Sequence, residues 1–294
     1  MHSIAGEHLR GVISMLVAVA AFCLMDASLK ILAPHYPPMQ VSALRGLTSL
    51  PLVLVWTMID GGPRQLFRIR WTLHLFRGVL SVVMLAAFIY ALQTLPLAEA
   101  YSLFFVAPLL ITALAMPILG ERVGWRRWTA IVVGSLGTVI VLRPTGSGML
   151  SIGGIAVLVA AVGYALSAIT VRVLGRTDST QSMVVWMLVM VSVFSTMLAW
   201  PDWKPIAVEH WKPLVVLALT GAIGQYGVTE AFRRAPASLI APLEYTALVW
   251  GIGLDWILWQ TLPDAWMLVG AAVIVCCGLY LLRGERVHAE AEHP

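Results

Sequence analysis

Charged side chains are scarce in this sequence. Asp, Glu, Lys and Arg make up 12% of the 294 residues, whereas a soluble domain carries about 25%. Hydrophobic residues make up 60% of the chain, and the mean hydropathy is +0.87. A water-soluble core of this chain length cannot bury so much apolar surface, so part of that surface must face lipid. The composition therefore predicts an integral membrane protein.

Cysteine is also rare. Cys23, Cys276 and Cys277 lie inside apolar runs and show no CxxC spacing. This placement is typical of small packing residues, so we expect neither a disulfide nor a metal site. The net charge of +4 comes from basic residues at the ends of apolar runs. Because these residues form no single basic stripe, we expect no nucleic-acid partner.

Motifs of enzymes and of nucleotide-driven pumps are missing. The sequence has no HExxH, no GxSxG and no Walker A loop, and its histidines lie in termini and loops except for His74 at a helix start. No charged ring or carbonyl-filter loop indicates a channel. We therefore expect no enzyme activity and no cofactor. An ion gradient, an exchange partner or the solute gradient would drive any transport.

Apolar segments of membrane-crossing length are present instead. Each has about 18–23 residues, enough to cross about 30 Å of hydrocarbon. The predicted spans cover residues 10–32, 41–59, 71–93, 97–119, 126–142, 152–173, 181–200, 212–232, 238–260 and 265–282. The predicted fold class is an all-α integral membrane protein with ten transmembrane helices.

The two halves of the chain match each other. Gly11–Leu32 aligns with Gly153–Leu174 at an offset of 142 residues, and Lys30 falls on Arg172. Near the end of each half the offset is 140, where Leu142-Arg143 falls on Leu282-Arg283. Internal duplication in a very apolar chain is typical of membrane transporters. We predict two repeats of five spans, over residues 1–146 and 147–294.

The distribution of Lys and Arg predicts the orientation. With a cytoplasmic N-terminus, the inside segments hold Arg10, Arg64, Arg68, Arg70, Arg122, Arg126, Arg127, Arg176, Arg233, Arg234, Arg283 and Arg286. The outside loops then hold only Arg143, Lys204 and Lys212. This asymmetry favours a multi-pass protein of a bacterial-type inner membrane with both termini cytoplasmic. Since five is odd, the second repeat would be inverted relative to the first, as in carriers that open alternately to each side.

A recognisable pattern lies in residues 90–144, which read YALQTLPLAEAYSLFFVAPLLITALAMPILGERVGWRRWTAIVVGSLGTVIVLRP. Its features are YAL-x-x-LP-LAEA, then Pro108, then Gly120-Glu121-Arg122 at the end of the fourth span, and a Gly-spaced fifth span ending in Leu-Arg-Pro. The second half echoes this pattern from Ala235-Pro236 onward. In these features the chain resembles the EamA-type transporters of the drug/metabolite transporter superfamily. One departure is Gln260-Thr261, where that family usually has Gly-Glu, so Glu121 has no symmetric counterpart.

The resemblance implies a ten-helix carrier with a central cavity, lined mainly by the first, third, fourth, sixth, eighth and ninth helices. Members move amino acids, other metabolites, nucleotide-like compounds, vitamins or amphipathic drugs, and many are exporters. The fifth and tenth helices often form a scaffold or a dimer contact. Their small residues Gly134, Gly137, Gly270 and Gly278 fit either a homodimer or ordinary packing.

Charged residues inside the spans need a partner, water or a function, because each costs about 2.5–3.5 kcal/mol at mid-bilayer. Asp26 either pairs with Lys30, four residues on, or serves as a cation or proton site. Arg45 and Arg77 either snorkel to the nearer interface or bind the solute. Glu99 either caps the fourth helix or contacts the solute.

Glu244 is the strongest candidate for a functional carboxylate. We predict it two turns inside the ninth helix, on one face with Leu248, Gly251 and Asp255. A carboxylate in an apolar setting can carry a proton at physiological pH, so Glu244 and Asp26 are the proton-coupling candidates. The remaining candidates for solute contact are polar and aromatic: Tyr101, Ser102, Tyr164, Gln225, Tyr226, Tyr245 and Trp250.

Acidic, basic and aromatic candidates together favour a solute that bears both charges. We predict a secondary transporter that exports a small zwitterionic metabolite, such as an amino acid or a compound derived from one. Three alternatives stay open: uptake of a nucleoside- or vitamin-like solute such as S-adenosylmethionine or riboflavin, release of an amino-carboxylate metallophore, and flipping of a lipid-linked sugar. The expected partners are the small solute, the lipid bilayer and a proton.

Overall fold

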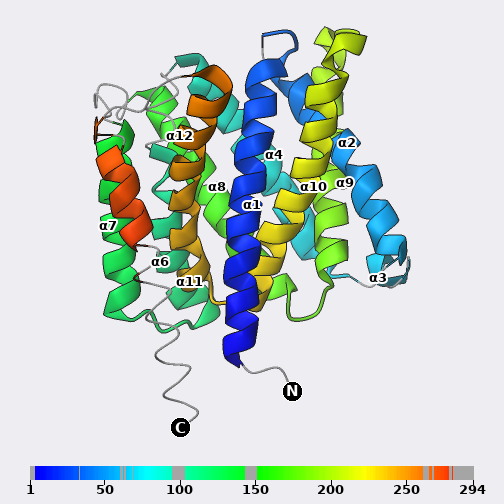
Figure 1. The fold of residues 1–294 in the computed structure, drawn as a ribbon. Coiled ribbons are helices and arrows are strands. Elements are labelled where there is room, and N and C mark those ends of the chain that lie inside the picture. The colour runs from blue at the N-terminus through cyan, green and yellow to red at the C-terminus, as the bar shows by residue number, and fades with distance from the viewer. Residues whose placement is uncertain are drawn as a thin grey trace.

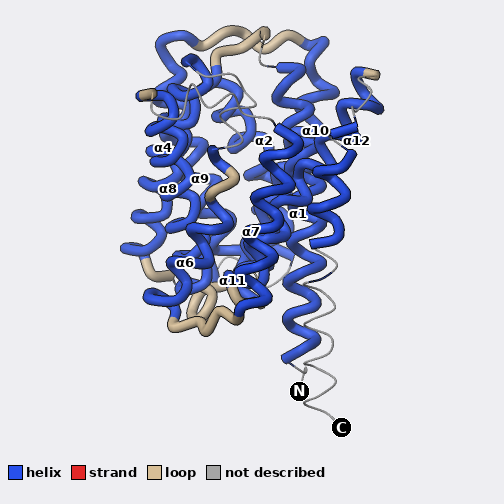
Figure 2. Tube along the Cα trace, turned by 90° about the vertical axis from the view of Figure 1, so that its left-hand side faces the viewer, coloured by secondary structure: helices blue, strands red, loops and turns tan. Residues whose placement is uncertain are grey.

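The computed structural model describes residues 4–32, 34–59, 62, 64–67, 69–94, 103–142, 151–260, 265, 266, 268–277 and 280. Within this described part the chain forms helices and the turns between them, with no strand (Figure 2). Six of the helices are long and apolar enough to cross a membrane. The structure is therefore that of a multi-pass helical membrane protein.

Helices occur within each of the predicted span ranges. Those of the first half are α1 (Ile4–Leu32), α2 (Pro38–Ile59), α3 (Arg64–Phe67), α4 (Trp71–Thr94), α6 (Ala107–Leu119) and α7 (Trp125–Leu142). Those of the second half are α8 (Ile152–Leu174), α9 (Thr180–Ala199), η1 (Trp200–Asp202), η2 (Val208–His210), α10 (Trp211–Arg234), α11 (Ala237–Ile240), η3 (Ala241–Tyr245) and α12 (Thr246–Trp259). A further apolar helix covers Leu268–Cys277.

Local sequence explains where several helices begin and end. Ser151 precedes α8, and its Oγ accepts the N–H of Gly154 at 3.1 Å. Ser179 does the same for α9. Such caps satisfy N–H groups that have no partner within the helix. α6 ends at Gly120, whose φ of 69° lies in the left-handed region that glycine adopts without strain.

α1 and α8 run in opposite directions. We call the end of the molecule where α1 begins the proximal face, and the end where α1 finishes the distal face (Figure 1). α8 finishes at the proximal face, where Arg172 Nη1 donates to the carbonyl of Arg233 at 2.7 Å. α10 also ends there, and its Arg234 pairs with Glu7 of α1. Two segments that align in sequence therefore point opposite ways.

The main helix contacts join one half of the chain to the other. α1 packs against α10 and α12, between which it lies in Figure 1. α2 packs against α9, and α8 packs against α4 and α6. Each contact has an equivalent with the halves exchanged: α1 on α10 corresponds to α8 on α4, and α1 on α12 to α8 on α6. The two halves therefore interlock rather than form separate bodies.

Small residues allow the closest of these contacts. A Cβ added to Gly46 of α2 would lie 2.4 Å from Ser192 Oγ of α9. A Cβ on Gly227 of α10 would lie 2.8 Å from the carbonyl oxygen of Ser14 in α1. Helices in lipid associate through such close packing, because lipid tails are as apolar as the side chains.

A polar contact closes the helix bundle at each face. In the distal clasp, Tyr36 Oη lies 2.8 Å from His210 Nδ1 and accepts the N–H of Ala207 at 2.9 Å. In the proximal clasp, Asp178 Oδ2 lies 2.8 Å from His74 Nε2 and accepts the N–H of Arg70 at 3.2 Å. Each clasp joins a turn of one half to a helix start of the other half.

Candidate functional site

The ninth predicted span is a broken helix rather than a continuous one. The short α11 passes into the 3₁₀ segment η3, and the regular α12 starts only at Thr246. Pro242 explains the break, since proline has no N–H to donate in a helix interior. Glu244 lies in η3, so its predicted placement on one stripe of a continuous α-helix is wrong. Such tighter turns within a helix often mark functional sites.

Tyr164 of α8 is the hydrogen-bond partner of Glu244. Its Oη donates to Glu244 Oε1 at 2.9 Å. The Tyr164 ring lies 5.7 Å from the ring of Phe104, which lies 5.5 Å from that of Phe88. The structure thus brings together two predicted site residues, Tyr164 and Glu244, beside a row of aromatic rings that the sequence did not single out.

Arg77 of α4 points inward. It is only 4% exposed, and it donates from Nε to Ser167 Oγ at 3.3 Å and from Nη1 to the carbonyl of Met183 at 3.1 Å. Tyr164 is near enough to interact with it electrostatically. The interpretation of Arg77 as a residue that snorkels to the cytoplasmic interface is therefore wrong. A buried cation is costly unless a negative group balances it.

Asp26 of α1 and Arg45 of α2 are two residues of opposite charge that lie near each other. They interact electrostatically, and the Arg45 guanidinium lies 5.5 Å from the centre of the Phe22 ring. Such stacking on a ring favours a cation facing inward over one extended to the interface. Cys23, one turn before Asp26, donates to the carbonyl of Ala247 at 3.5 Å. This contact places the Asp26 region of α1 against the start of α12, close in sequence to Glu244.

Other predicted site residues lie elsewhere. Tyr245 is 1% exposed; its Oη donates to the carbonyl of Phe105 and lies 2.8 Å from Ser135 Oγ of α7. Tyr226 packs its ring against Trp56 of α2, and Trp250 is 48% exposed. None of these three is brought to Glu244 by a side-chain hydrogen bond or ring contact that the described residues show. Gln225 is buried in α10. Glu99, Tyr101 and Ser102 lie outside the described residues, as does the Lys30 side chain.

Glu230 of α10 is buried and has a structural role. It pairs with Arg233 at 3.8 Å and with Arg234, and Thr180 of α9 also donates to it. These contacts lie at the proximal face. Glu230 therefore stabilises the junction between α9 and α10 rather than facing a solute.

His74 and Asp178 form a buried contact that the sequence analysis did not predict. Both side chains are almost fully buried, and they meet across 104 residues of chain. The offset of 142 that aligns the two halves places Asp178 on Tyr36. That alignment was the one available signal, and it becomes meaningful only when both residues are seen to bind the opposite half.

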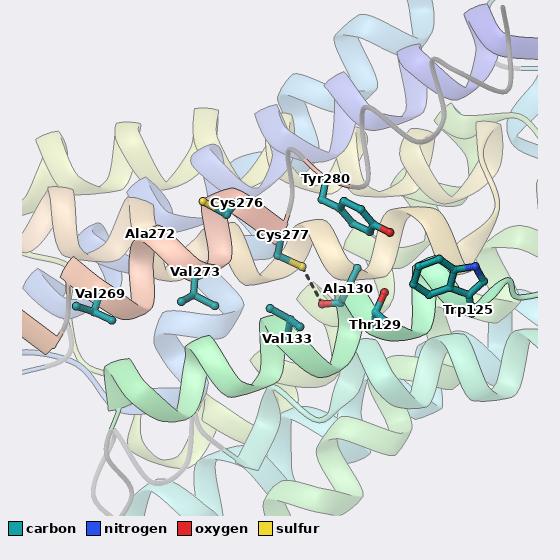
Figure 3. A pocket seen from close by; sticks show the side chains of 10 residues that line it. All are labelled: Trp125, Thr129, Ala130, Val133, Val269, Ala272, Val273, Cys276, Cys277 and Tyr280. Atoms are coloured by element: carbon teal, nitrogen blue, oxygen red, sulfur yellow. Dashed lines mark hydrogen bonds between the residues drawn. The ribbon is translucent and has the colours of Figure 1, made fainter.

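One apolar groove lies on the outside of the helix bundle. It has a volume of about 690 Å³ between α7 and the helix Leu268–Cys277 (Figure 3). Its lining is almost wholly apolar and consists of Trp125, Thr129, Ala130, Val133, Val269, Ala272, Val273, Cys276, Cys277 and Tyr280. At its floor, Cys277 Sγ donates to the carbonyl of Ala130 at 2.8 Å. No residue of the Glu244 site contributes, so this groove is a surface feature of a lipid-facing helix pair.

Comparison with known proteins gives one family. The model of the EamA-like transporter family matches residues 9–143 and again residues 151–284. The chain is 25% identical to the pseudopaline exporter CntI of Pseudomonas aeruginosa, over 94% of this chain and 97% of that protein. It is 26% identical to a riboflavin transporter of Vibrio cholerae, covering 99% and 98% of the two chains. It is 24% identical to an S-adenosylmethionine uptake transporter of Rickettsia prowazekii, covering 100% and 99%.

The fold has a counterpart among solved structures. A crystal structure superimposes with a TM-score of 0.83, covering 97% of this chain and 100% of the other, at 20% identity. At that identity the likeness concerns the fold alone. Over 97% of its length the chain therefore has a fold that is already seen in a solved structure.

Proposed function

The chain belongs to the EamA-like transporter family, and we propose that it carries a small zwitterionic metabolite across the cell membrane by alternating access. The family and its named relatives are membrane transporters rather than enzymes. A small solute and the lipid bilayer are therefore its partners. Our proposal concerns the identity of the solute, the direction in which it moves and the coupling of its movement to a proton.

The pairing of opposite charges at the site supports a zwitterionic solute. Glu244 and Asp26 offer negative groups to an ammonium, and Arg77 and Arg45 offer donors to a carboxylate. The observation that carries the proposal is Arg77, a buried cation whose side-chain hydrogen bonds, among the residues that the structure describes, go to the neutral oxygens of Ser167 and Met183. A solute carboxylate would supply the missing negative charge, as buried ions require.

The accessibility of the two carboxylates supports an internal hollow. Asp26 is exposed and Glu244 half-buried, although Glu244 is bonded to Tyr164 of α8, and Cys23, one turn before Asp26, is bonded to Ala247 of α12. This combination is expected for side chains at the wall of a space inside the bundle. We propose that solute and proton reach Glu244 and Asp26 through that space, so that proton release drives solute movement.

The opposite directions of α1 and α8 support two inverted repeats, and we propose that each repeat crosses the membrane five times. We propose that the proximal face is cytoplasmic, because the described Arg residues between helices gather there. Residues 1–146 and 147–294 would then be the repeats whose relative rocking exposes the central site to each side in turn.

Export is the direction that we propose, as in the relative named a pseudopaline exporter. The second candidate is uptake of a ring-bearing solute, as the names of the riboflavin and S-adenosylmethionine relatives suggest. The ring row Phe88, Phe104 and Tyr164 favours it, because aromatic rings stack on flat ring systems.

Flux measurements test the proposal directly. The purified protein is reconstituted in proteoliposomes, and a panel of radiolabelled amino acids, S-adenosylmethionine and riboflavin is offered with and without an imposed proton gradient. Metabolite profiles of cells with and without the gene show the direction. Proton-dependent flux of amino acids supports the proposal, and saturable flux of riboflavin alone replaces it by the second candidate.

A further inference from the structure

Glu121 makes three hydrogen bonds to the start of the broken ninth helix. Its Oε1 accepts the N–H of Ala237 at 2.9 Å. Its Oε2 accepts the N–H of Ser238 at 3.2 Å and the Ser238 hydroxyl at 2.8 Å. Glu121 follows Gly120 at the end of α6, 116 residues earlier in the chain. A carboxylate from the first half therefore caps a helix of the second half.

The capped helix is too short to hold its own position. α11 has four residues, so its first N–H groups have no acceptor within the helix. Ionised acceptors form the stronger hydrogen bonds, and a negative charge is favourable at a helix N-terminus. The hydrogen bonds from Glu121 therefore help to hold the start of α11 in position.

α11 passes without a loop into η3, which carries Glu244. Residues 237–243 and Tyr245 are buried, and Glu244 is the one side chain of this segment that is not. A segment so enclosed transmits a displacement of its start along its length, because packed interiors yield little. Movement of α11 would therefore move Glu244 relative to Tyr164.

Two arginines contact the anchor, by which we mean Glu121 together with its partners Ala237 and Ser238. Arg127 Nη1 donates to Ser238 Oγ at 2.8 Å, and Arg172 Nε lies 3.8 Å from Glu121 Oε1. The equivalent position in the other half differs. Gln260 matches Gly120 at the offset of 140 and shares its left-handed backbone, with φ of 55°, but Thr261 follows it instead of a glutamate. A carboxylate anchor of this kind is thus encoded in the first half alone.

We propose that Glu121 is a positioning residue that holds η3 in place and thereby keeps Glu244 against Tyr164. The inference rests on the proposed role of Glu244 in transport, but its geometry does not depend on which solute is carried. Glu121 itself does not contact the solute. It fixes the distance between the proximal ends of α6 and α11, and through them the position of the functional carboxylate.

Labelling with dicyclohexylcarbodiimide tests this inference without any solute. The reagent modifies protonated carboxyls in apolar surroundings, and mass spectrometry of peptides reports the rate at Glu244 in the purified full-length protein. At a pH at which most of Glu244 is ionised, we expect Glu121→Ala to raise that rate about tenfold, the factor for losing a hydrogen bond to a charged group. Tyr164→Phe should raise it similarly by removing the bond directly, and Glu121→Asp should raise it less.

Glu7→Gln is the matched control. Glu7 is also a carboxylate of the proximal face, but it pairs with Arg234 of α10 and not with α11, so the rate at Glu244 should stay unchanged. Should Glu121→Ala fail to fold, Ser238→Ala removes one bond of the anchor and should give a smaller increase. A lower melting temperature with an unchanged labelling rate in the Glu121 and Ser238 variants would show a merely structural role and overturn the inference. Loss of transport in all assays would instead overturn the proposed function and leave the labelling result standing.

Discussion

Tyr36 and Asp178 occupy equivalent positions in the two halves of the chain, 142 residues apart, and each fastens its own turn to the opposite half. The backbone N–H of Tyr36 donates to the carbonyl of Leu32 at 3.2 Å, and that of Asp178 to Leu174 at 2.8 Å. The same turn is therefore formed twice. The side chains differ: a phenol meets His210 at the distal face, and a carboxylate meets His74 at the proximal face.

This difference predicts unequal effects on stability. Asp178→Ala leaves buried His74 and the Arg70 N–H without their carboxylate acceptor, and each such hydrogen bond to a charged group is worth about 1.5–3 kcal/mol. Tyr36→Phe removes two neutral hydrogen bonds, those with His210 and the Ala207 N–H, each worth about 1 kcal/mol. Thermal unfolding in detergent micelles should therefore show a larger fall for Asp178→Ala. Equal falls for the two variants would contradict a tighter proximal clasp.

Glu244→Gln should separate solute binding from proton coupling. The amide keeps an oxygen that accepts the Tyr164 hydroxyl, but it can no longer take up and release a proton. Proton-driven flux in proteoliposomes should fall at least about tenfold and lose its dependence on pH. Glu209→Gln, at an exposed carboxylate of η2, serves as the control. A proton-coupled rate like that of the unmodified protein would remove Glu244 as the coupling site.

Tyr164→Phe distinguishes the two candidate solute classes. The variant keeps the ring beside Phe104 and loses the hydrogen bond to Glu244. If the solute is zwitterionic, the displaced carboxylate should raise the apparent KM about tenfold. If the solute stacks on the ring row, the apparent KM should change less than about threefold. Initial rates over a range of solute concentrations give the answer.

Gly227→Ala tests the close contact of α10 with α1. The added Cβ would lie 2.8 Å from the carbonyl oxygen of Ser14, a backbone atom that cannot rotate away. We expect a loss of about 1–3 kcal/mol, as for other overpacked contacts. Gly251→Ala in α12 is the control, since nothing lies within 4 Å of its added Cβ. That variant should be neutral or slightly stabilising, and both melting temperatures can be read from one thermal-shift experiment.

Glu244 shows how far the site could be predicted. Its identity as a costly carboxylate in an apolar run was available from the sequence, and its bond to Tyr164 was not. Pro242 was visible too, but the length and form of the break it causes depend on how Glu121 anchors the preceding turn. For Arg77 the sequence left both snorkelling and an inward position open, because the two give the same sequence pattern. Its hydrogen-bond partner Ser167 is 90 residues away in the sequence, so the sequence could not show the contact.

The sequence by itself determined that this protein is a bundle of membrane helices with an internal repeat. Hydropathy, helix caps and the offset between the halves are properties of neighbouring or aligned residues, so they can be read along the chain. Only the tertiary structure decided which polar groups meet: Tyr164 with Glu244, His74 with Asp178, and Glu121 with α11. Each pair is separated by at least 80 residues, and the interlocking of the two halves brings its members together.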